Sequence, residues 1–267
     1  LVYYNTGQFS DACTAFGKIM KASNFVEKRM VVDALLGEAL SFQLLGNGGG
    51  VDRVERDMVE LTRKLQDPEY AELAASGSAR LALLRGEVER ASELVAYLTA
   101  RPKPENLFIW LEEPVVTVAR VRLARGRPEN ISLALDDLEE LRSKIAAHHL
   151  ECRAVDVMAV QSLAWEKRGN RTLALQLMAE ALALAAPANW LRPFLELGQA
   201  LVPLLKTLDA EEPTQKFVQL VLAKLAANLQ QGEPEPPAFR PVANEVQQVM
   251  LTIGLTNREL DILELLA

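Results

Sequence analysis

Residues 7–16 read Gly7-Gln8-Phe9-Ser10-Asp11-Ala12-Cys13-Thr14-Ala15-Phe16. After the glycine, apolar or small residues stand at positions +2, +5 and +9, and Ile19 adds one at +12. This spacing is typical of one face of a helix. Separations of 39, 40, 40 and 43 residues lead from this glycine to four others: Gly46, Gly86, Gly126 and Gly169. The sequence therefore predicts an internal repeat of about 40 residues, which organises the chain up to residue 186.

Each repeat is expected to be a pair of antiparallel helices joined at its glycine. The glycine takes the left-handed conformation that ends the first helix, and the second helix begins two or three residues later. Because one pair cannot bury its apolar face alone, neighbouring pairs should stack. The predicted fold class is all-α, a right-handed α–α superhelix. The first helices are expected at Val31–Leu45, Leu73–Arg85, Pro114–Arg125 and Val155–Arg168.

The pattern weakens at two places. In the second unit, Asn47-Gly48-Gly49-Gly50 suggests an inserted turn, and Glu55 stands where an apolar residue is expected. After the last repeat, two further helices at about Arg192–Leu208 and Pro213–Leu229 should form a capping pair.

The expected domain organisation has three parts. Residues 1–230 form the superhelical domain, and residues 231–254 form a linker. Four prolines fall between residues 231 and 241, which favours an extended conformation there. Residues 255–267 begin a separate helix.

The repeat motif, Gly-x-(Phe/Tyr)-x-x-Ala, is clearest at Gly7–Ala12 and resembles the tetratricopeptide repeat. That repeat runs about 34 residues, whereas the present one is longer, which implies longer helices. The longer period is similar to that of the tetratricopeptide-like superhelix in MalT-like regulators. Two stretches carry this resemblance most strongly: Ala164-Trp165-Glu166-Lys167-Arg168-Gly169-Asn170-Arg171-Thr172-Leu173-Ala174-Leu175 and Trp190-Leu191-Arg192-Pro193-Phe194-Leu195-Glu196-Leu197-Gly198. The resemblance implies a sensor region that precedes a LuxR-type output domain.

Residues 255–267 carry a second resemblance. Thr256 and Glu259 have the spacing of a capping box, and leucines follow at helical intervals. Together with Arg258, this string closely resembles the first helix of the LuxR-type helix-turn-helix DNA-binding domain. The resemblance implies that Thr256, Arg258 and Glu259 begin that domain, and that the recognition helix would follow Ala267.

Composition indicates a soluble globular chain, with 49% hydrophobic and 24% charged residues. The net charge of −7 disfavours binding to phosphate backbones, so DNA is an expected partner only through the C-terminal domain. Since no apolar run approaches about 18 residues and no signal segment opens the chain, we expect a cytoplasmic protein with no membrane partner.

Leu1 is not an initiator methionine, so further sequence is expected upstream. Cys13 and Cys152 are interpreted as two thiols in preference to a disulfide.

No motif for catalysis or cofactor binding is evident. The phosphate-binding pattern Gly-x4-Gly-Lys-(Ser/Thr) does not occur, and the family resemblance implies ATP only in an upstream module. His148, His149 and Cys152 are interpreted as helix surface, because a zinc site needs more ligands than they supply. With only two histidines, neither in a recognisable setting, the chain is not expected to be an enzyme.

The candidate binding residues come from the repeat register. The residue six positions before a repeat glycine should face the concave wall, and two consecutive repeats have Arg80 and Arg120 there. The residues thirteen positions before the glycines are also expected to point inward; they are Asp33, Leu73, Glu113 and Asp156. Arginine forks and carboxylates in one groove would suit a polar effector. The alternative is that these arginines only pair with neighbouring acids.

Two functions remain open. In the first, the chain is the sensor region of a LuxR-family transcriptional regulator, where a small effector or a regulatory protein binds the superhelix and self-association is possible. In the second, it is a tetratricopeptide-type scaffold for partner proteins, unrelated to transcription. The three tryptophans, Trp110, Trp165 and Trp190, are expected to anchor helix packing, with stacking on an effector as the alternative.

Overall fold

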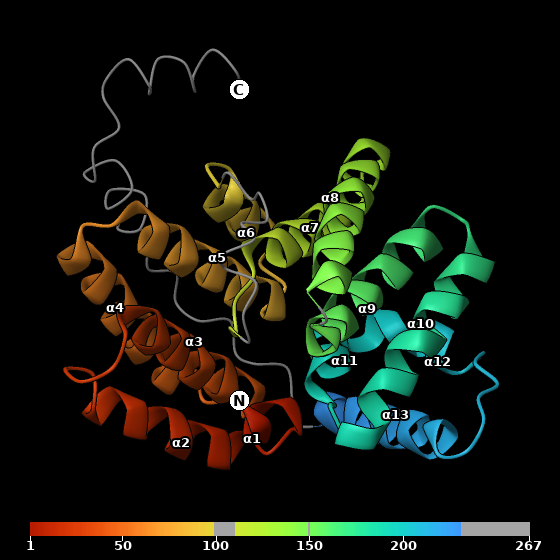
Figure 1. The fold of residues 1–267 in the computed structure, drawn as a ribbon, viewed down its shortest axis with the longest axis horizontal. Coiled ribbons are helices and arrows are strands. Elements are labelled where there is room, and N and C mark those ends of the chain that lie inside the picture. Colours follow the sequence, from red (N-terminus) through yellow and green to blue (C-terminus); the bar gives the residue numbers. More distant parts are fainter. Residues whose placement is uncertain (99–109, 149, 231–267) are drawn as a thin grey trace.

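The computed structural model describes residues 1–98, 110–148 and 150–230. These residues form helices and connecting turns, with no β-strand in the described ranges. Successive helices pair and the pairs follow one another around an arc, as Figure 1 shows. The predicted all-α fold of tetratricopeptide-like helix pairs is thus confirmed.

The arc has an inner and an outer layer of helices (Figure 1). Each inner helix contacts the inner helix of the next pair, so this layer forms a continuous wall. The inner helices are α3 (Lys28–Leu44), α5 (Pro68–Leu84), α7 (Pro114–Arg125) and α9 (Glu151–Lys167). The outer helices are α2 (Phe9–Lys21), α4 (Gly48–Leu65), α6 (Val88–Val95), α8 (Pro128–Ala147) and α10 (Arg171–Ala185).

The repeat glycines end helices as predicted. Their φ angles are all positive, which places them in the left-handed region where a side chain is disfavoured. The values are 75° at Gly7, 72° at Gly46, 76° at Gly86, 69° at Gly126 and 84° at Gly169. The following helix begins two residues later in each unit, and α7 has the bounds expected from the sequence.

One expectation for the second unit was wrong. Residues 48–50 do not form an inserted turn, because α4 starts at Gly48. The Asn47 side chain caps this helix by accepting a hydrogen bond from the Gly50 amide at 3.0 Å, which offsets the poor helix propensity of glycine. Glu55 is buried although it is charged, and it forms ion pairs with Arg85 at 3.7 Å and Arg90 at 3.3 Å.

The expected capping pair is also only partly correct. A continuous helix over residues 192–208 was wrong, because Gly198 has φ 63° and ψ −144°, a conformation outside the helical region. The segment is divided into short pieces, whereas the second helix of the pair is intact. These elements are α11 (Arg192–Leu197), a 3₁₀ turn (Gly198–Leu201), α12 (Val202–Leu205) and α13 (Thr214–Gln230).

The two ends of the arc meet. The short helix α1 (Val2–Asn5) lies against α11, and Tyr4 is completely buried there. If Gly7 had a Cβ atom, it would lie 3.4 Å from the Leu191 side chain, so the following turn also contacts this region. The concave wall is therefore enclosed by contacts between residues that are 192 and 187 positions apart in sequence.

Small residues allow the inner helices to be buried on several sides. All residues from 73 to 82 in α5 are buried, and most are alanine, serine or glycine. Between α2 and α3, a Cβ atom on Gly37 would lie 2.3 Å from Phe16 Cζ, so only glycine permits this approach.

Trp165 and Trp190 pack against the apolar core, as expected. Across the described ranges, no helix combines the length and the apolar character needed to cross a membrane.

Candidate functional site

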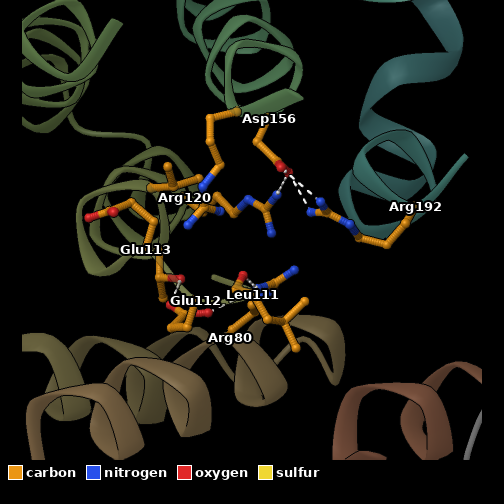
Figure 2. Close-up of a pocket in the computed structure, with 10 residues that line it drawn as sticks. Arg80, Leu111, Glu112, Glu113, Arg120, Asp156 and Arg192 are labelled. Atoms are coloured by element: carbon orange, nitrogen blue, oxygen red, sulfur yellow. Dashed lines mark hydrogen bonds and ion pairs between the residues drawn. The ribbon is translucent and has the colours of Figure 1, made fainter. Parts of the chain in front are cut away.

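Buried charged side chains from four helices meet on the inner wall (Figure 2). Arg80 comes from α5, Arg120 from α7 and Asp156 from α9, while α11 contributes Arg192 and Glu196. None of the five residues is more than 9% exposed. The register explains the first two, because Arg80 and Arg120 occupy equivalent positions in consecutive repeats. Charged residues are rarely buried to this extent unless they are paired.

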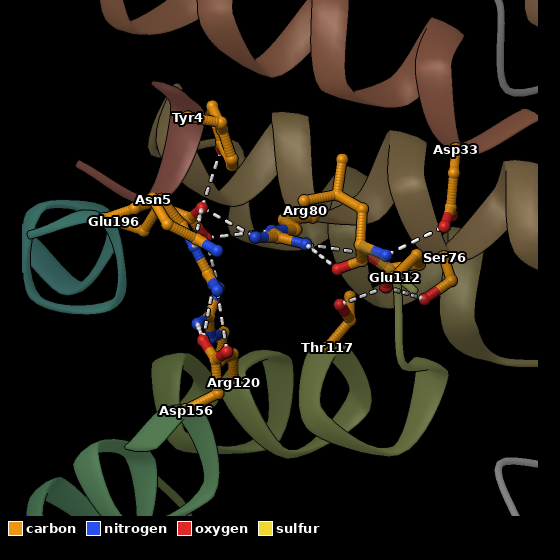
Figure 3. A network of polar contacts seen from close by, with 12 residues as sticks. Tyr4, Asn5, Asp33, Ser76, Arg80, Glu112, Thr117, Arg120, Asp156 and Glu196 are labelled. Atoms are coloured by element: carbon orange, nitrogen blue, oxygen red, sulfur yellow. Dashed lines mark hydrogen bonds and ion pairs between the residues drawn. The ribbon is translucent and has the colours of Figure 1, made fainter. Parts of the chain in front are cut away.

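Glu196 is the centre of this network (Figure 3). Arg80 donates two hydrogen bonds to its carboxylate, at 2.9 Å and 2.6 Å, and Arg120 donates a third at 2.7 Å. The Tyr4 hydroxyl donates a fourth, also at 2.7 Å, and thereby joins α1 to α11. Burial opposes the charge of Glu196, but Arg80, Arg120 and Arg192 outweigh that cost and hold its pKa well below the ordinary value.

Asp156 binds two of these arginines, Arg192 and Arg120. Arg192 donates to both of its oxygens, with the Nη2–Oδ2 distance at 2.8 Å, and Arg120 approaches Oδ1 at 3.5 Å. Although burial alone would raise the pKa of Asp156, these two guanidinium groups lower it below the ordinary value. Arg192 also donates from Nε to Asn5 Oδ1 at 3.0 Å, a second contact between the ends of the arc.

A non-helical segment before α7 completes the network (Figure 3). Glu112 is 1% exposed, and its carboxylate accepts hydrogen bonds from Ser76 and Thr117, both at 2.6 Å, and from Arg80 at 2.9 Å. Arg80 also donates to the carbonyl oxygen of Leu111 at 3.1 Å. Arg80 therefore bridges this segment and the Glu196 carboxylate.

A cavity lies beside these groups, as Figure 2 shows. Its empty volume of about 230 Å³ includes space that is open to solvent, and the part enclosed by protein is only about the size of one water molecule. In its present form the cavity has room only for a water-sized polar group. Arg120 Nε is buried nearby without a hydrogen-bond partner in the described part of the chain. Burial raises the pKa of the Glu113 carboxyl group in the cavity wall, an effect partly offset by Arg153.

The four residues selected from the sequence, Arg80, Glu113, Arg120 and Asp156, all line this one cavity. The sequence left two alternatives for Arg80 and Arg120: a place in a groove, or pairing with neighbouring acids. The structure shows both, because each arginine pairs with carboxylates and also borders the cavity. Effector binding by these residues stays a prediction. The proposed start of the DNA-binding domain, Thr256, Arg258 and Glu259, lies outside the described residues, as does the expected linker.

Sequence reasoning missed the residues that hold the network together. Glu196 and Arg192 stand four residues apart in the stretch that closes the family resemblance, but no repeat glycine assigns them to the inner wall. Tyr4 gains its partner only through the closure of the arc. Glu112 precedes α7 and therefore has no helical register that would place it.

Within the described ranges, no three histidine, cysteine or acidic residues are arranged to hold a metal ion. The carboxylates of Glu112, Asp156 and Glu196 form ion pairs with guanidinium groups, which occupy the positions that a cation would take. The arrangement is chemically suited to recognition by hydrogen bonds and charge.

Comparison with known proteins supports this description of the fold. The family model described as the MalT-like TPR region matches residues 2–211. No curated protein and no solved structure matches the chain significantly. The match extends from α1, through all the repeat glycines, to the residues beyond α12.

Proposed function

The chain belongs to the MalT-like TPR region family, and on this premise we propose that it is the sensor region of a LuxR-family transcriptional regulator of the MalT type. A small effector or a regulatory protein binds the inner wall, and this binding controls a DNA-binding domain on the C-terminal side. The region itself acts in the cytoplasm, catalyses no reaction and needs no cofactor.

The observation that carries this proposal is the charged network beside the cavity. Replacing a buried ion-pair network with well-packed apolar residues often leaves a protein equally or more stable. Fold stability alone therefore gives little reason for Arg80, Arg120 and Asp156 to meet at a cavity on the concave wall. Recognition of a polar ligand gives a reason for both features.

The chemistry of the cavity favours a small, hydroxyl-rich effector group. The carboxylates of Glu112, Asp156 and Glu196 balance the charges of Arg80, Arg120 and Arg192, so the network supplies donors and acceptors with little net charge. A charge-assisted hydrogen bond in such a shielded place contributes roughly 1.5–3 kcal/mol.

Coupling to an output domain requires two states with different affinities for the effector. The network offers such a coupling, because Arg192 and Glu196 belong to α11, whereas their partners belong to α5, α7 and α9. An effector that takes over a hydrogen bond from Arg120 would change how α11 is held. Since α11 precedes the segment leading to the C-terminus, its position is the proposed signal.

A thermal-shift screen of small metabolites tests the proposal. A genuine effector should raise the melting temperature of the wild-type chain and bind Glu113→Gln about tenfold more weakly or worse. Glu113 suits this purpose because burial raises the pKa of its carboxyl group, so the buried charge itself costs stability and the neutral variant should remain folded. Glu129→Gln, an exposed residue in the first turn of α8, is the matched control. An effector that binds both variants equally would contradict the assignment of the site.

An assay of DNA binding distinguishes this proposal from the alternative that the chain is a scaffold for partner proteins. Under the present proposal, residues 1–230 should not bind duplex DNA specifically, and a longer chain that includes a complete helix-turn-helix domain should do so. The measurement is a mobility-shift titration at physiological salt. If the longer chain has no affinity for DNA, the region is better described as a protein-interaction scaffold.

A further inference from the structure

The segment Trp110–Glu113 is held along the inner wall by contacts to its main chain. Asp33 of α3 accepts a hydrogen bond from the Leu111 amide at 2.8 Å. Arg80 of α5 donates to the Leu111 carbonyl oxygen at 3.1 Å, and Arg29 of α3 donates to the Glu112 carbonyl oxygen at 2.8 Å. Side chains from two consecutive repeats thus satisfy the backbone of a non-helical segment (Figure 3).

The same wall also has separate places for the side chains of this segment. Leu111 is 4% exposed and packs in an apolar cluster that includes buried residues of α2, α3 and α4. The Glu112 carboxylate fits between the hydroxyl groups of Ser76 and Thr117 and the guanidinium of Arg80. Trp110 lies under the Arg29 guanidinium, whose carbon is 5.2 Å from the ring centroid.

Such contacts are those of a receptor and a bound peptide. The main-chain hydrogen bonds would hold any extended peptide, and the leucine and glutamate positions would select its sequence. We propose that the wall formed by α3, α5 and the start of α7 is a peptide-binding surface, which the chain occupies with its own Trp110–Glu113 segment. A partner protein that presents an extended aromatic-Leu-Glu element binds there by displacing this internal ligand.

This inference rests on the proposed function, because it assigns a partner class to the same wall. It also explains why the cavity is small, since Leu111 and Glu112 form part of its lining. The internal segment is joined to α7 through Pro114 and acts at a high effective concentration, of millimolar order for short connections. An external peptide therefore competes poorly with the intact wild-type segment.

Variants that weaken the internal ligand should expose the surface. Leu111→Ala removes the apolar anchor, and Glu112→Gln removes the charge that faces Arg80, while a supplied peptide restores either group. The probe is a fluorescein-labelled Trp-Leu-Glu-Glu-Pro peptide, measured by fluorescence anisotropy with each full-length variant. Both variants should bind it at least tenfold more tightly than the wild type does. Leu133→Ala is the matched control, because Leu133 is 50% exposed on α8, away from this wall.

Peptide variants test whether the two selective positions act as proposed. Leu111→Ala should lose at least tenfold in affinity when the probe is changed to Trp-Ala-Glu-Glu-Pro. For Glu112→Gln, the same loss is expected with Trp-Leu-Gln-Gln-Pro. Equal binding of all three peptides would overturn the proposal.

Circular dichroism measures whether each variant is helical before and after the probe is added. A variant that folds alone should bind the probe, and one that does not should regain helix when the probe is added. If both variants neither bind nor refold, the peptide surface is refuted. Because the metabolite screen uses the intact segment, an effector that still binds wild type would leave the proposed function standing.

Discussion

At the scale of single residues, Glu196 determines how the inner wall is held together. Its carboxylate accepts hydrogen bonds from side chains of α1, α5 and α7 while it lies on α11. Removing one partner from a buried charge network leaves the others without compensation, which typically costs about 3–5 kcal/mol. Glu196→Gln should therefore lower the free energy of unfolding by about that amount at pH 7. Urea denaturation measures it, and the exposed Glu129→Gln should stay within about 0.5 kcal/mol of wild type.

The same residue predicts a pH dependence. The pKa of Glu196 is depressed in the folded protein, whereas in the unfolded chain it lies near the ordinary value of about 4.3. A group of this kind stabilises the fold fully above its unfolded pKa and loses that contribution as the pH falls toward its folded pKa. The stability gap between wild type and Glu196→Gln should be largest above pH 5 and should shrink below about pH 4. A gap that stays constant from pH 7 to pH 3 would show that the carboxylate charge is not the stabilising feature.

At the scale of elements, close approach of helices limits which side chains are tolerated. Replacing a glycine inside a helix by alanine usually stabilises it by about 1 kcal/mol. Gly17→Ala in α2 should follow this rule, since a Cβ atom there meets nothing within 4 Å. Gly37→Ala in α3 should destabilise the protein instead, by about 1–3 kcal/mol, because its Cβ would overlap the Phe16 ring. Melting temperatures of the two variants should move in opposite directions.

A second seam between elements leads to a similar prediction. Ala174 of α10 is fully buried against α9, where its carbonyl oxygen accepts a hydrogen bond from the Ser162 hydroxyl at 2.6 Å. Ala174→Leu should overpack this seam and cost about 1–3 kcal/mol. Leu184→Ala, a change at a 40% exposed position of the same helix, serves as the comparison in thermal denaturation. An unchanged melting temperature for Ala174→Leu would mean that α9 and α10 can separate without cost.

The elements also show what could be predicted from sequence. The helix ends followed from glycine spacing, because a left-handed residue is a local requirement that glycine meets best. Arg80 and Arg120 could be placed on the wall because their register repeats with the helices. Glu112 could not, since it stands in a non-helical segment whose position depends on Asp33 and Arg80, far away in sequence. The break at Gly198 was also missed, because the apolar pattern around it resembles a continuous helix.

At the scale of the whole molecule, the contact between α1 and α11 changes how the protein should unfold. Open repeat proteins are held only by contacts between neighbours, so their ends can unfold separately. Here Tyr4 and Asn5 join the first unit to the last. Urea unfolding of wild type should therefore give coincident transitions by circular dichroism and by tryptophan fluorescence. In Tyr4→Phe/Asn5→Ala the two transitions should separate, whereas Tyr3→Phe, which alters a 47% exposed neighbour, should behave like wild type.

The meeting of the two ends also has a consequence for how such a protein can evolve. An open repeat array can gain or lose a unit at little cost, because the remaining units keep their neighbours. In this chain, one added unit would move α11 away from α1 and would separate Glu196 from Tyr4. The number of repeats is thus fixed by geometry, and new specificities have to arise by exchanging side chains on the inner wall at constant length.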